Sequence, residues 1–140
     1  MAIGQGVLQS AVLDVGEADR LCARMERRNR DRHAQHAAQL IDALELDRVH
    51  RDAGMALQTS AVIALTLRCS EDRASGWLQD ARELESLRTA LPAMTAGLLT
   101  IEQSRVVIDV LGPIDDADLV QRVWDRLLVR LEQDARIGAV

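Results

Sequence analysis

The chain has almost no aromatic residues. It contains no Tyr and no Phe, and its two aromatic side chains are Trp77 and Trp124. Strands favour aromatic and β-branched residues, whereas Ala and Leu, which dominate the apolar 48% of this chain, favour helices. Prolines are scarce as well, since only Pro92 and Pro113 occur in 140 residues. No alternating apolar and polar run is long enough for a strand. The sequence therefore predicts an all-α fold.

Cysteines and long apolar runs are also nearly absent. Cys22 and Cys69 have no motif spacing, so a reduced, cytoplasmic environment is the simplest expectation. No stretch approaches the roughly 18 apolar residues of a membrane span, and we expect no membrane association. Met1 is not followed by a basic segment with a long apolar stretch, so we expect no signal peptide.

The charge is acidic overall but unevenly distributed. A net charge of −5 argues against an obligate nucleic-acid binder, because such domains are usually basic. All 17 basic residues are Arg, and six of them lie within residues 20–32, against Glu26 and Asp31, which gives that segment a local charge of +4. Arg24, Arg27 and Arg28 in this segment form either a strip that contacts phosphates or a solvated helix face with local ion pairs.

We expect a bundle of about five to six helices. The chain divides into three predicted parts: a flexible N-terminus (1–16), a long N-terminal helix or helical arm (17–53), and a compact helical domain (54–140). The segment Glu26–His33 has no apolar residue, so it is either a solvent-spanning stretch of one helix or a break between two. An apolar stripe then returns, formed by Ala34, Ala37, Ala38, Ile41, Leu44 and Val49.

Capping signals divide the rest of the chain. Ser70 suits the start of one helix, Thr100 and Gln103 form a capping box, and Asp115 or Asp116 suits the start of the last helix. Pro92 suits a first turn, Gly97 a helix end, and Gly112-Pro113 a stop after Ile101–Leu111. The segment Leu57–Arg68 is apolar on most sides, which predicts burial. The expected core residues are Leu65, Trp77, Leu84, Val107, Ile108, Val123 and Leu127.

The stretch Ala64–Trp77 fits the layout of a helix-turn-helix. Small Ala64 and Ala74 and the turn at Cys69-Ser70 lie where that motif needs them, although Arg68 occupies the place where glycine is usual. In this interpretation Arg68 and Arg73 flank the start of the second helix and contact DNA. Glu71 and Asp72 at the same helix start would repel phosphates. Any packed pair of helices produces a similar pattern.

No catalytic or metal site is evident in the sequence. His33 and His36 lie at i, i+3 and resemble half a metal site, but no further ligands accompany them. Two solvated histidines are the simpler interpretation. No serine or cysteine lies in a recognisable nucleophile setting. We therefore expect neither enzymatic activity nor a bound metal or cofactor.

From about Leu44 to Leu131 the sequence resembles the actinobacterial 13E12 repeat family, also called domain of unknown function 222. The residues that carry the resemblance are Ala61-Val-Ile-Ala-Leu-Thr-Leu-Arg-Cys-Ser70, Ala81-Arg-Glu-Leu84, Leu91-Pro92-Ala93, Ala96-Gly97, Thr100 and Ser104-Arg105-Val-Val-Ile108. Family members often carry this helical region ahead of an HNH nuclease domain, and some lie near mobile elements. This chain has no His-Asn-His metal-finger segment, so no nuclease residues can be transferred to it.

Two functional hypotheses remain. The first is a non-enzymatic helical accessory module that binds duplex DNA or positions an HNH nuclease partner. The second is an interaction module that forms homo-oligomers through its long helix.

Overall fold

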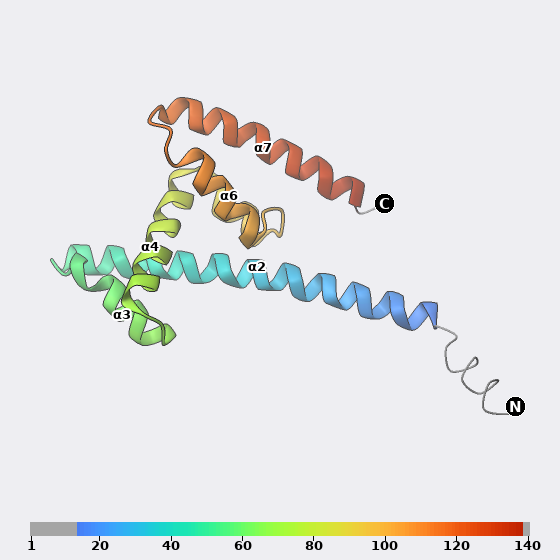
Figure 1. The fold of residues 1–140 in the computed structure, drawn as a ribbon, viewed down its shortest axis with the longest axis horizontal. Coiled ribbons are helices and arrows are strands. Elements are labelled where there is room, and N and C mark those ends of the chain that lie inside the picture. Colours follow the sequence, from blue (N-terminus) through green and yellow to red (C-terminus); the bar gives the residue numbers. More distant parts are fainter. Residues whose placement is uncertain (1–13, 139–140) are drawn as a thin grey trace, which may run out of the picture.

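The computed structural model describes residues 14–138, and every regular element in that range is helical. The elements are α2 (Val15–Asp52), the 3-10 helix η1 (Ala56–Gln58), α3 (Thr59–Leu67), α4 (Glu71–Ser86), α5 (Ala90–Thr95), α6 (Ile101–Leu111) and α7 (Ala117–Gly138). The predicted all-α fold with a long N-terminal helix is therefore confirmed. Figure 1 shows α4 crossing one end of α2, with α6 lying between α2 and α7.

Helix α2 is a single helix of 38 residues. It begins after Asp14, whose side chain accepts a hydrogen bond from the Glu17 N–H at 3.1 Å. Residues 15 and 16, which we predicted to be flexible, belong to this helix; residues 1–13 of the predicted N-terminus lie outside the described part of the chain. The polar stretch is continuous helix rather than a break. Within residues 14–32 no side chain is buried, so this half of α2 is an arm (Figure 1).

The packed face of α2 begins where the arm ends. Its buried residues recur at intervals of three and four, which places them on one side of the helix. They are His33, Ala37, Leu40, Ala43, Leu44 and Asp47. The predicted stripe was partly wrong, because Ile41 and Val49 are exposed while two polar residues, His33 and Asp47, are buried. The burial pattern follows the geometry of the packed face more closely than it follows side-chain polarity.

The main core lies where α4 and α5 pack against this face of α2, and it continues outward to residues of α6 and α7. Leu84 and Val107 are buried in it as predicted, and Trp77, Ile108 and Val123 are partly buried against it. A smaller cluster joins α2, α3 and α4 through Ala43, Ile63, Ala64, Ala74 and Leu78. Trp77 packs against both clusters.

Two predicted core positions are exposed. Leu65 is 81% exposed and Leu127 is 40% exposed. The predicted burial of the segment around α3 is also wrong, since Leu57 in η1 is 97% exposed. Helix α3 has only nine residues and buries only Thr59, Ile63 and Ala64, so its remaining surface faces outward.

The caps predicted at Ser70, Thr100 and Asp116 and the helix end at Gly97 are confirmed. Thr59 and Ser60, which the sequence offered as caps of the preceding helix, instead lie inside α3, whose start has no side-chain cap. Ser70 accepts from the Arg73 N–H at 3.1 Å, and Thr100 and Gln103 form a reciprocal capping box. Asp116 accepts from the Leu119 N–H, and Gly97 has a positive φ of 77° just beyond α5. Each of these signals is local, which explains why the sequence alone was sufficient to place the helix ends.

The connection between α3 and α4 places Arg68 in an unfavourable backbone conformation. Its φ of 55° and ψ of 49° are left-handed, which terminates α3. The Cβ of an L-residue crowds the following carbonyl in this conformation, so glycine is preferred there. The structure thus confirms that Arg68 occupies a position suited to glycine.

Replacing Arg68 with glycine is expected to stabilise the fold. Arg68→Gly removes the left-handed penalty and should raise the free energy of unfolding by about 1 kcal/mol. Chemical denaturation measures the change. The matched control is Arg68→Ala, which also removes the charge but retains a Cβ, and should give no gain. Equal stability of the two variants would contradict a backbone origin.

The buried carboxylate of Asp47 joins α2 to α4. Its Oδ2 accepts from Arg82 at 3.0 Å and lies 3.0 Å from Nε of Arg51. Burial alone would raise the pKa of this carboxyl, but hydrogen bonding with Arg82 and Thr59, together with the charges of Arg82 and Arg51, outweighs it, and the pKa lies below the ordinary 3.8. Ionised Asp47 therefore stabilises the folded state.

Asp47→Asn should reduce stability by about 2 kcal/mol at neutral pH, because it removes hydrogen bonds to a charged group. Since the folded-state pKa is depressed, the contribution of Asp47 is present above pH 3.8 and is lost as the pH falls below that value. Denaturation curves of the two proteins should therefore converge in acid. Glu45→Gln is the control: its exposed pair with Arg48 should contribute less than about 1 kcal/mol. A difference that grew in acid would refute this role.

Candidate nucleic-acid interface

The arm of α2 carries four exposed arginines without acidic partners among the described residues, namely Arg24, Arg27, Arg28 and Arg30. Arg24, Arg27 and Arg28 form no ion pair with any residue in the described range, whereas Arg20 pairs with Glu17 at 2.8 Å. Residues four apart lie on the same side of a helix, so Arg24, Arg28 and Arg32 follow one ridge. The next position along this ridge is His36. We call Arg24, Arg27 and Arg28 the basic strip. It lies on the arm, and the ridge through Arg24 and Arg28 leads to the body of the protein.

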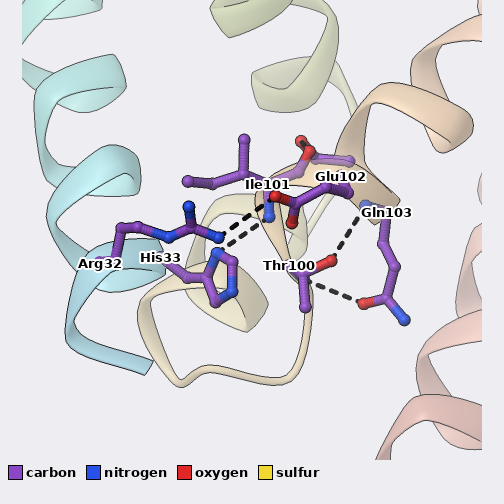
Figure 2. A network of polar contacts seen from close by, with 7 residues as sticks. Arg32, His33, Thr100, Ile101, Glu102 and Gln103 are labelled. Carbon is purple, nitrogen blue, oxygen red and sulfur yellow. Dashed lines mark hydrogen bonds and ion pairs between the residues drawn. The ribbon is translucent and has the colours of Figure 1, made fainter. Parts of the chain in front are cut away.

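The ridge reaches the body where α2 meets the start of α6. Figure 2 shows Nδ1 of buried His33 accepting the Ile101 N–H at 3.1 Å, while Arg32 pairs with Glu102 at 3.2 Å. The prediction of two solvated histidines was wrong. His33 is buried and supplies an acceptor at the first turn of α6, and the ring of His36 lies edge-on to Trp77 with centroids 6.0 Å apart.

Arg68 and Arg73 line one groove together with Arg105 of α6. The groove has a volume of about 730 Å³ and lies between α2, the α3–α4 connection, α4 and α6. His36, Trp77 and Asp80 form part of its wall. The structure places Arg68 and Arg73, which the sequence analysis singled out, on the same groove as Arg105. Arg24, Arg27 and Arg28 lie apart from them on the arm.

The groove holds an excess of positive charge. Asp80 lies 3.4 Å from Arg105, and burial raises the pKa of this carboxyl despite the opposing charge of Arg105. Burial also lowers the pKa of His36, and the nearby His33 and Arg105 lower it further, although Asp80 acts in the opposite direction. His36 is therefore mainly neutral at pH 7, and the charge in the groove comes from three arginines and one aspartate.

The acidic start of α4 faces a different hollow. Glu71, Asp72 and Ser75 line a second depression with Arg51 and Arg82, whereas Arg73 and Gly76 line the arginine groove. The helix-turn-helix interpretation assigned Glu71, Asp72 and Arg73 to one helix start. In the structure Glu71 and Asp72 line one hollow, while Arg73 lines the other.

Sequence reasoning missed Arg105 as a site residue. It lies 25 positions or more from the α3–α4 residues that share its groove, and no local motif marks it. Among residues 14–138, no three His, Cys, Asp or Glu side chains group as a metal site would require. Over the same range, no helix is long and apolar enough to cross a membrane.

No family model, curated protein or solved structure matches the chain. The resemblance to the 13E12 repeat family therefore stays a prediction that rests on the residues quoted above.

Proposed function

We propose that the protein is a non-enzymatic helical module that binds duplex DNA through its phosphate backbone. The observation that carries this proposal is the unpaired basic strip of Arg24, Arg27 and Arg28 on the projecting arm. An acidic protein binds DNA when its positive charge is gathered on one surface, because phosphate contacts release counterions locally. The resemblance to a family associated with HNH nucleases adds a role: holding DNA for such a nuclease partner.

The charge pattern favours backbone contacts over base readout. In a helix-turn-helix the start of the second helix enters the major groove. Here that start carries Glu71 and Asp72, which line a hollow apart from the arginine groove and would approach phosphates closely in such a docking. Phosphate contacts position a protein on DNA but carry no sequence information. We therefore propose binding with little sequence preference.

Binding to a short duplex should weaken steeply as salt rises. Replacing Arg24, Arg27 and Arg28 together with Ala should weaken binding to all sequences alike, and should reduce the magnitude of the salt slope by roughly 2 to 3. Fluorescence anisotropy over a salt series measures both effects. The matched control replaces Arg122, Arg126 and Arg130 of α7, which changes the net charge equally. Absence of binding at about 50 mM salt, or an equal effect of the control, would refute the proposal.

Self-association is the second candidate function, and exposed apolar side chains on the arm favour it. Leu21 and Met25 lie four residues apart on α2 and are both exposed, as is Val15 near the start of the helix. Pairing the arm with a second copy would remove this surface from water at roughly 25 cal/mol per Å². The occupant we propose for this surface is the same arm of another copy, which gives a homo-oligomer.

Sedimentation at tens of micromolar should then show a dimer. Replacing Leu21 and Met25 together with Glu should return the protein to a monomer, since charge replaces the apolar contact. Val110→Glu on α6, another exposed apolar position, is the control and should leave the dimer intact. A monomeric wild-type protein would exclude this function without affecting the DNA proposal.

A further inference from the structure

We propose that the groove between α2, the α3–α4 connection and α6 is a binding site for a single phosphate group, held by Arg68, Arg73 and Arg105. The inference deepens the proposed function, because one backbone phosphate of DNA is the source we favour. The evidence for the site comes from the residues of the groove and not from the arm. Because these residues would recognise the phosphate group itself, the site should bind inorganic phosphate as well.

The three arginines reach the groove from separate parts of the fold. Arg68 comes from the end of α3, Arg73 from the first turn of α4 and Arg105 from the middle of α6. Asp80 is the carboxylate that shares the groove with them, and within residues 14–138 neither Arg68 nor Arg73 forms an ion pair with an acid. Three guanidinium groups facing one carboxylate leave an unbalanced positive charge. Guanidinium groups match phosphate oxygens in geometry as well as in charge.

The walls of the groove strengthen this attraction. Ile63, Ala74, Trp77 and Ile101 contribute apolar surface beside the arginines. Charges in a cleft with apolar walls are less screened than charges on an open surface, so the field within the cleft is focused.

The backbone of Arg68 is the second, independent observation. This residue holds a left-handed conformation in which glycine would be favoured by the fold. Strained backbone positions of this kind are concentrated at ligand sites, where the side chain has a use that offsets the strain. The proposal assigns such a use to the guanidinium of Arg68, which lines the groove.

Asp80 acts as an internal competitor for the ligand. Its oxygen lies 3.4 Å from Arg105, so an entering phosphate competes with this carboxylate for the same guanidinium. Inorganic phosphate carries more charge and more acceptor oxygens than a carboxylate, and in the proposed site Arg68 and Arg73 would bind it together with Arg105. Removing the carboxylate charge should therefore strengthen phosphate binding.

The two tryptophans provide a direct test. Trp77 lies in the groove, whereas Trp124 is fully buried and its indole N–H donates to the Arg88 carbonyl at 2.7 Å. An NMR spectrum of the ¹⁵N-labelled protein should contain two indole signals. Titration with inorganic phosphate should shift the Trp77 signal in a saturable manner and leave the Trp124 signal in place. Sodium chloride at equal ionic strength should not reproduce the shift.

Variants then assign the effect to named side chains. Arg68→Gly removes the guanidinium while relieving backbone strain, so the variant folds, and it should weaken phosphate binding roughly tenfold. Arg105→Ala should do the same, and Asp80→Asn should tighten binding several-fold. Arg126→Ala on α7 removes one charge elsewhere and serves as the control. An unmoved Trp77 signal, or equal binding by Arg68→Gly and the control, would overturn the proposal.

The outcomes for phosphate and for DNA are distinguishable. Replacing Arg24, Arg27 and Arg28 should weaken duplex binding while leaving the phosphate titration of Trp77 unchanged. If duplex DNA binds but phosphate does not shift Trp77, the groove proposal is wrong and the arm proposal stands. If phosphate binds and duplex DNA does not, the groove site stands without the DNA function. If duplex DNA shifts the Trp77 signal and phosphate displaces the duplex, the groove binds a phosphate of the DNA backbone and both proposals hold.

Discussion

The structure depends on the packing of one face of α2, which is fixed at both ends by buried polar contacts. His33 accepts the first N–H of α6 at one end, and Asp47 accepts from Arg82 of α4 at the other. These residues are 14 positions apart, so about 21 Å of helix separates them. Ala37 and Ala43 between them are small enough to let the neighbouring helices approach closely. The two contacts fix α4 and α6 against the same helix, and the arginine groove lies between these elements.

This arrangement divides α2 into a packed half and a free half with different chemical character. The packed half contributes to a core in which Trp124 of α7 is fully buried and bonded to the turn before α5. The free half carries most of the clustered arginines and no buried side chain. Like charges in a folded body repel one another, but an exposed helix lets water and salt screen them. The fold thus tolerates a local excess of positive charge within an acidic chain.

The sequence was sufficient for the features that depend on local interactions. The helix starts at Ser70 and Thr100 and the helix end before Gly97 follow from side chains that bond their own backbone or permit a left-handed residue. Burial could not be predicted in the same way, because it depends on which helices pack together. Leu65 is exposed since α3 is covered on one side only, and polar His33 is buried since α6 begins opposite it. Two of the arginines that line the groove, Arg68 and Arg73, could be identified from the sequence. Arg105 could not, because tertiary packing brings that residue to the groove.

The electrostatics of the groove explain how three arginines and one aspartate coexist without cancelling. Burial raises the pKa of Asp80, the charge of Arg105 opposes that rise, and the nearby Glu83 and Asp109 add to it. Asp80 and Arg105 form an ion pair at 3.4 Å, so one of the three arginines already has a partner within the groove. Arg68 and Arg73 form no ion pair within residues 14–138, so Asp80 balances at most one of the three positive charges that line the groove. This imbalance is what an entering oxyanion would offset.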